Sequence, residues 1–116
     1  MAGEARGDDA AARRAEADLL RRRLRDRDLV VALDERGEAP TSEGLAARLR
    51  EAERSGGRDL AFLVGGPGGL DPSLLADASW KLSLSRLTLP HQLARLVLVE
   101  QLYRALTILR GEPYHK

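Results

Sequence analysis

The chain of 116 residues contains no cysteine, one tryptophan, one phenylalanine, two tyrosines and two histidines. The lack of cysteine excludes a disulfide framework, a thiolate nucleophile and a thiolate zinc site. His91 and His115 are too few for a histidine-rich metal site, so we expect no metal. No apolar run approaches the ~20 residues of a membrane span, and the charged, alanine-rich first twenty residues are unlike a signal peptide. These absences predict a soluble, cytoplasmic domain.

The charges are balanced in number but unevenly distributed. The chain carries 19 basic and 18 acidic side chains, for a formal net charge of +1. Residues 80–116 hold six basic and two acidic groups, whereas residues 1–79 hold 13 basic and 16 acidic groups. A basic C-terminal third is compatible with a partner that carries phosphates, and equally with ordinary surface charge.

The hydrophobic pattern predicts helices that alternate with short buried strands. Residues 1–9 are expected to be a disordered lead-in, and residues 10–116 one domain. Continuous apolar runs at 29–33 and 60–64 predict strands that are buried on both faces, and residues 80–84 are expected to form a third strand. Helices are expected at 10–26, 41–54, 71–76 and 90–110, and loops at 34–40 and 85–89, with Thr41 or Ser42, Asp71 and Gly111 as caps. This order predicts an α/β fold with a mainly parallel sheet.

The last predicted helix is apolar around most of its circumference and must be covered on several sides. A domain with three strands offers too little surface to cover it. We therefore expect part of this helix to lie in a homodimer interface, because large apolar patches rarely stay exposed.

The glycine cluster at residues 65–69 matches no nucleotide-binding motif. A P-loop would need Gly-Lys-Ser/Thr where Leu70 and Asp71 stand, and a dinucleotide fingerprint would need a small residue at Asp71. The cluster is either a tight turn without a ligand or a strand end that lets a ligand approach the bare backbone. Ligands of open α/β sheets bind at the carboxyl ends of strands. We expect the strand ends at Leu33, Gly65 and Ser85 to converge on one pocket.

Four segments carry a resemblance to a known family: residues 62–70 (FLVGGPGGL), 82–91 (LSLSRLTLPH), 99–105 (VEQLYRA) and 112–116 (EPYHK). They closely resemble the RlmH family, the bacterial pseudouridine N3-methyltransferases of large-subunit ribosomal RNA, within the SPOUT superfamily. The resemblance spans about residues 19–116. It implies a SPOUT-type sheet whose C-terminal part forms a trefoil knot. It also implies S-adenosylmethionine bound mainly by main-chain groups at Leu33, Gly65, Gly66, Leu84, Ser85, Arg86, Leu87, Thr88, Leu89 and Pro90.

The resemblance further implies a homodimer in which the partner's C-terminal tail completes each site. The substrate would be a pseudouridine in 23S ribosomal RNA, preferably within the assembled ribosome. Our hypothesis is that His115, or water ordered by it, removes the N3 proton. Tyr114 would stack on or orient the base, and Arg104 would steady the tail or a phosphate. Further phosphate contacts are expected from basic residues of the C-terminal third: Arg86, Arg95, Arg110 and Lys116.

One departure from the family concerns the N-terminus. Members usually begin with a strand, a helix and a strand that precede the first residues of this chain, so we expect an N-terminally shortened domain. The shortening is either natural or the result of a misassigned start site. Two alternatives to the methyltransferase function remain: a catalytically impaired dimer that binds the cofactor or RNA, and a SPOUT enzyme that acts on tRNA.

Overall fold

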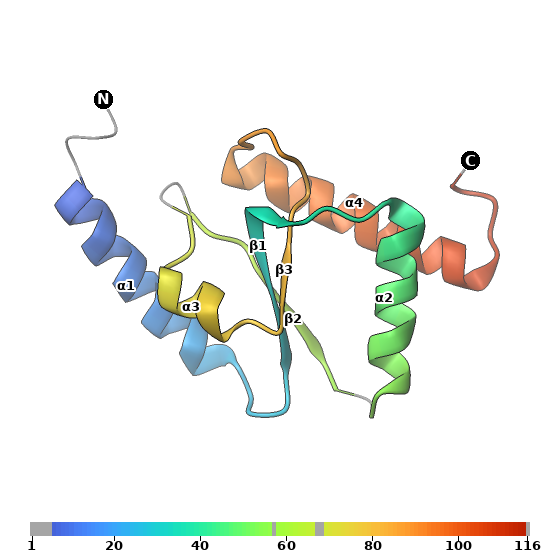
Figure 1. Ribbon diagram of the computed structural model, residues 1–116, viewed down its shortest axis with the longest axis horizontal. Helices are drawn as coiled ribbons and strands as arrows, with labels where there is room; N and C mark the ends of the chain where they lie inside the picture. Colours follow the sequence, from blue (N-terminus) through green and yellow to red (C-terminus); the bar gives the residue numbers. More distant parts are fainter. Residues whose placement is uncertain (1–5, 57, 67–68, 116) are drawn as a thin grey trace.

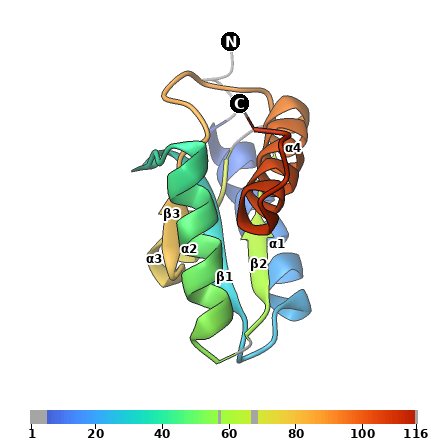
Figure 2. The same cartoon turned by 90° about the vertical axis from the view of Figure 1, so that its right-hand side faces the viewer.

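The computed structural model describes residues 6–56, 58–66 and 69–115. Its elements are α1 (Arg6–Arg23), β1 (Leu29–Glu38), α2 (Ser42–Arg54), β2 (Leu60–Leu63), α3 (Pro72–Asp77), β3 (Trp80–Leu82) and α4 (His91–Arg110). The three strands form a parallel sheet in the order β2-β1-β3. Helices α1 and α3 lie on one face of the sheet, and α2 and α4 on the other (Figures 1 and 2). The predicted α/β fold with a parallel sheet is confirmed.

Both faces of the sheet are covered, and successive side chains of the central strand β1 pack on opposite faces. Val31 and Ala32 are both buried and point to opposite faces. Val31 packs with residues of β3, α2 and α4, namely Leu45, Ala46, Leu82, Leu98 and Ala105. Ala32 packs with a second cluster formed by Ala17, Leu63, Leu70 and Leu74. Continuous apolar runs therefore predicted doubly covered strands correctly.

The largest difference from the prediction is in β1, which continues through residues 34–38 although a loop was expected there. The pairing with β3 shifts register between Leu33 and Glu38, and the Ser83 amide donates to the Glu38 carbonyl at 2.7 Å. A Cβ on Gly37 would lie 2.6 Å from the Lys81 carbonyl oxygen, so glycine permits this close approach. This charged extension of β1 is held by its pairing with β3, and the local sequence of residues 34–38 does not indicate that pairing.

The ends of α1 also differ from those expected. The helix begins at Arg6, inside the segment that was expected to be disordered, and residues 1–5 lie outside the described residues. It ends at Arg23, before the expected Asp26, because a turn follows in which the Asp28 amide donates to the Arg25 carbonyl at 2.9 Å. The additional residues 6–9 are Arg-Gly-Asp-Asp, and glycine and aspartate have low helix propensity, so local propensity does not account for the earlier start.

The predicted caps are confirmed. The Thr41 hydroxyl accepts from the Gly44 amide at 3.0 Å, and the Asp71 carboxylate accepts from the Ser73 amide at 3.1 Å. Gly111 ends α4 with a φ of 71°, a left-handed conformation that favours glycine. No helix of the described residues is long and apolar enough to cross a membrane. The trefoil knot stays a prediction.

Helix α4 is covered on one side only. Its residues Leu98 and Ala105 are buried in the core. The opposite side carries large apolar side chains that are 43 to 66% exposed, which we call the α4 stripe: Leu93, Leu96, Val99, Tyr103 and Leu106. Their spacing of three or four residues puts them on one face of the helix. The apolar excess seen in the sequence therefore corresponds to a surface that the subunit leaves open.

Candidate active site

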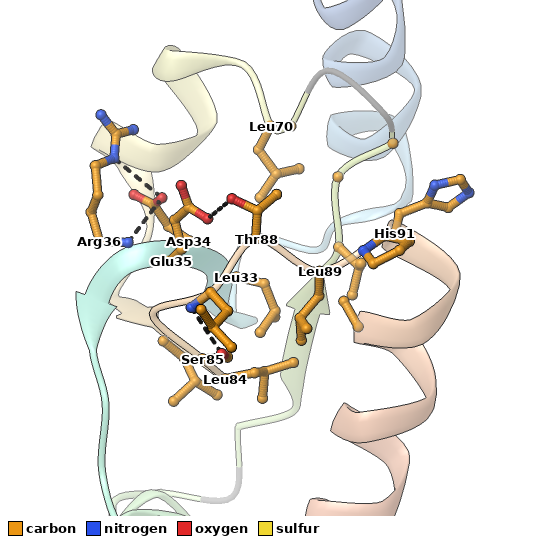
Figure 3. Close-up of a pocket in the computed structure, with 18 of the residues that line it drawn as sticks. Leu33, Asp34, Glu35, Arg36, Leu70, Leu84, Ser85, Thr88, Leu89 and His91 are labelled. Atoms are coloured by element: carbon orange, nitrogen blue, oxygen red, sulfur yellow. Dashed lines mark hydrogen bonds and ion pairs between the residues drawn. The ribbon is translucent and has the colours of Figure 1, made fainter.

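Residues 33–36 of β1, the turn after β2 and the loop between β3 and α4 converge on one cavity of about 820 Å³ and supply its walls (Figure 3). Nine of the ten positions expected to hold the cofactor line it: Leu33, Gly65, Gly66, Leu84, Ser85, Leu87, Thr88, Leu89 and Pro90. The tenth, Arg86, is exposed and does not line the cavity. The structure thus brings together segments that lie far apart in the sequence.

The glycine turn forms one wall by bringing two backbone segments into close contact. The Gly69 amide donates to the Gly66 carbonyl at 2.9 Å, and Gly69 has a φ of 80°. A Cβ on Gly65 would lie 2.5 Å from the carbonyl carbon of Gly69 and 2.6 Å from the Leu70 nitrogen. Glycine at position 65 is therefore required by the turn itself. Of the five positions in this cluster, 67 and 68 lie outside the described residues.

The loop between β3 and α4 is held in place by its own hydroxyl groups. The Ser85 hydroxyl accepts from the Leu87 amide at 2.9 Å, and the Ser83 hydroxyl donates to the Ser85 carbonyl at 3.0 Å. The Thr88 hydroxyl donates to the Glu35 carboxylate at 2.8 Å, which ties the loop to the end of β1 (Figure 3). These bonds shape the cavity before any ligand is bound.

Four charged or ionisable side chains outside the ten expected cofactor positions also line the cavity: Asp34, Glu35, Arg36 and His91. The Asp34 side chain is 14% exposed and accepts from the Arg36 amide at 3.3 Å and its Nε at 3.4 Å. Asp34 directly follows Leu33 at one of the strand ends that were expected to converge. Glu35 and Arg36 were expected in a loop, whereas β1 continues through both positions.

The three side chains expected to act in catalysis lie together at the other end of α4. Arg104 Nη1 lies 3.1 Å from Nδ1 of His115, and the guanidinium carbon lies 4.8 Å from the centre of the Tyr114 ring. Glu100 binds Arg104 Nη2 at 2.6 Å and accepts from the Tyr114 hydroxyl at 2.9 Å. Glu43 of α2 lies 2.9 Å from Nε2 of His115. These five residues form what we call the tail cluster.

Hydrogen bonds within the tail cluster set its protonation states. The bond from Arg104, followed by that from Tyr114, lowers the pKa of the Glu100 carboxyl. The hydrogen bond that the Tyr114 hydroxyl donates to Glu100 raises the pKa of the Tyr114 phenol, which therefore stays protonated at neutral pH. The hydrogen bond with His115 lowers the pKa of Glu43. The cluster therefore contains ionised carboxylates, a charged guanidinium and a phenol that donates.

The tail cluster and the cavity of one subunit are far apart. His91, which lines the cavity, is thirteen residues before Arg104 on α4. At 1.5 Å of rise per residue the two lie about 20 Å apart along the helix axis. Figure 1 shows the tail at one end of α4 and the loop that precedes the helix at the other. Within a single subunit, the structure does not bring Arg104, Tyr114 and His115 to the cavity.

Comparisons with known proteins identify the family to which this chain belongs. A family model described as predicted SPOUT methyltransferase matches residues 2–115, and the chain belongs to this family. Among its relatives is "Ribosomal RNA large subunit methyltransferase H" of Anaeromyxobacter sp. strain Fw109-5, 57% identical over 92% of this chain and 69% of that protein. A protein of the same name from Rhizobium meliloti is 50% identical over 97% of this chain and 71% of its own length. The family resemblance noted in the sequence is confirmed.

Proposed function

We propose that this protein transfers the methyl group of S-adenosylmethionine to N3 of a pseudouridine in large-subunit ribosomal RNA. The observation that carries the proposal is the convergence of three strand-end segments on one cavity. The relatives quoted above are named as methyltransferases of that RNA. Their names do not favour the alternative of a dimer that binds without catalysis. We further propose that residues 10–116 act as one domain, in the cytoplasm where ribosomes are modified.

The cavity suits S-adenosylmethionine in size and chemistry. Its volume of about 820 Å³ falls within the ~300–1,000 Å³ typical of small-molecule sites. Leucines at positions 33, 84, 87 and 89 supply apolar walls, and the glycine turn exposes main-chain groups. The carboxylates of Asp34 and Glu35 can accept hydrogen bonds from hydroxyl or ammonium groups, and Arg36, which pairs with Asp34 and also lines the cavity, can bind a carboxylate. When bound, S-adenosylmethionine supplies an electrophilic methyl carbon.

A homodimer explains how the tail cluster reaches a cavity. The α4 stripe runs from the cavity end of the helix to the tail end and is exposed in the subunit. In a two-fold dimer the same surface of both subunits meets itself. If the two-fold axis crosses the α4 stripe near Val99 and the two α4 helices are antiparallel, the tail end of one α4 lies beside the cavity end of the other. Each site would then consist of one subunit's cavity and its partner's tail.

The residues of the tail cluster have complementary roles in this site. His115, or a water ordered by it, accepts the proton of N3, so that the electron pair of N3 is free to receive the methyl group. Tyr114 stays protonated, so it orients the base by stacking or donation and does not act as a base. Arg104 steadies the tail or a phosphate. Arg86, Arg95 and Arg110 are exposed and can contact further phosphates; Lys116 lies outside the described residues.

The test is methyl transfer from tritiated S-adenosylmethionine to ribosomes that lack the modification, with tRNA as a parallel acceptor. We expect label at N3 of one large-subunit pseudouridine, and a rate lower by about 10²–10⁴-fold for His115→Ala. Calorimetry with S-adenosylmethionine accompanies the assay. Binding without transfer would support the impaired dimer, and label in tRNA alone would indicate a different SPOUT enzyme. Either result would overturn the proposal.

A further inference from the structure

Both ring nitrogens of His115 are engaged within their own subunit. Arg104 Nη1 lies 3.1 Å from Nδ1, and the Glu43 carboxylate lies 2.9 Å from Nε2. The ring is largely covered, with 24% of the side chain exposed. The histidine is therefore held between α2, which carries Glu43, and α4, which carries Arg104.

The chemistry of the two partners decides which nitrogen carries the proton. A guanidinium has only N–H donors, so the Nδ1 atom beside Arg104 must accept. A carboxylate accepts, and the hydrogen bond with His115 lowers the pKa of Glu43, which keeps this carboxylate ionised. Nε2 must therefore carry the hydrogen and donate it to Glu43. The arrangement selects a neutral imidazole in the Nε2–H tautomer, with its lone pair on Nδ1.

We propose that Glu43 is a positioning residue that fixes the His115 ring and makes Nδ1 the atom that accepts the N3 proton. This inference rests on the proposed function, in which His115 is the proton acceptor. The Nδ1 lone pair is covered by Arg104, so the contact between them opens when the substrate is bound. A phosphate is a suitable new partner for Arg104, because guanidinium groups bind phosphates through paired hydrogen bonds. The proton then moves from N3 to Nδ1, and Nε2–H keeps its bond to Glu43.

A set of three substitutions separates positioning from helix stability. Glu43→Ala removes the carboxylate. Glu43→Asp keeps an acidic group in the first turn of α2, where it interacts favourably with the helix dipole. Its side chain is one methylene shorter, so the carboxylate no longer reaches Nε2 of His115. Glu43→Gln retains an amide oxygen that can accept from Nε2–H. Glu53→Ala, at an exposed position of the same helix, is the matched control.

The first readout is the ¹⁵N chemical shifts of the His115 ring in the free protein, assigned with His91→Gln because the chain has only two histidines. We expect the Nε2–H tautomer in the wild-type chain and in Glu43→Gln, and a mixture of tautomers in Glu43→Ala and Glu43→Asp. The second readout is methyl transfer. Loss of the partner that orients a metal-ligating histidine costs about 10–100-fold. We expect a loss of that order in kcat for Glu43→Ala and Glu43→Asp, with KM for S-adenosylmethionine unchanged.

The possible outcomes distinguish this inference from the proposed function. If His115→Ala methylates as fast as the wild-type chain, the role of His115 fails, and the inference fails with it. If His115→Ala is inactive while Glu43→Ala keeps the wild-type tautomer and rate, only the inference fails. A wild-type ring in the Nδ1–H tautomer would also overturn the inference. A rate for Glu43→Asp equal to that of the wild-type chain would show that Glu43 acts only through the stability of α2.

Discussion

Replacing Gly65 with alanine tests whether the glycine turn is a required wall of the cavity. The new Cβ would lie 2.5 Å from the carbonyl carbon of Gly69 and 2.6 Å from the nitrogen of Leu70. Unstrained contacts between carbon atoms are about 3.5–4.0 Å long, so the facing backbone must move by about 1 Å. Both obstructing atoms belong to the main chain, and no side-chain rotation can relieve the contact. Overpacking of this kind costs about 1–3 kcal/mol.

The displaced wall lies where the ligand is expected to contact the backbone. If the whole cost falls on the bound state, the affinity for S-adenosylmethionine falls by about 5–150-fold. Calorimetric titration measures this loss, and thermal unfolding shows whether the variant is folded. Gly44→Ala is the control, because its Cβ would meet only Pro40 Cβ and Thr41 Oγ1, both at 3.3 Å, and Gly44 does not line the cavity. Wild-type affinity in Gly65→Ala would refute the assignment of the turn to the binding site.

Two further predictions concern the dimer and the tail. Leu96→Glu puts a charge in the middle of the α4 stripe. We expect this variant to sediment as a monomer at micromolar concentration. If it sediments as a dimer like the wild-type chain, the stripe is not the interface. The hydrogen-bonded Glu43 and Glu100 have pKa values below their usual range, so their contribution to holding the tail is complete above the usual carboxyl pKa and is lost as pH falls through the lowered values. The ring signals of Tyr114 in NMR spectra should move toward random-coil positions over an acid titration, and signals that stay unchanged after both carboxyls are protonated would contradict this.

The position of the cavity could be predicted from the sequence because it depends on few facts. Three short expected strands alternate with helices, which predicts parallel strands, and the carboxyl ends of parallel strands meet at one edge. Leu33, Gly65 and Ser85 follow directly from that rule, and the cavity they line is found there. The caps at Thr41 and Asp71 were equally accessible, because capping depends on residues only two or three positions apart.

Other features depend on packing between distant segments and have no local pattern. The extension of β1 through residues 34–38 is charged and lacks strand periodicity; its pairing with β3 and the small size of Gly37 allow it. Glu43 lies 72 positions from His115. Their contact depends on how α2 packs against α4, so no spacing in the sequence could have indicated it. Glu100 and Arg104 were recognisable as an ion pair because they are one helical turn apart.

The proposed activity requires each active site to combine the cavity of one subunit with the tail of the other. Co-expression of two differently tagged variants, Gly65→Ala and His115→Ala, tests it directly through methylation of unmodified ribosomes. At an S-adenosylmethionine concentration below the wild-type Kd, Gly65→Ala alone should lose about 5–150-fold in activity, and His115→Ala about 10²–10⁴-fold. A mixed dimer has one site with an intact cavity and an intact partner tail, so random mixing should restore about a quarter of the wild-type activity. A mixture no more active than its two components would contradict the composite site.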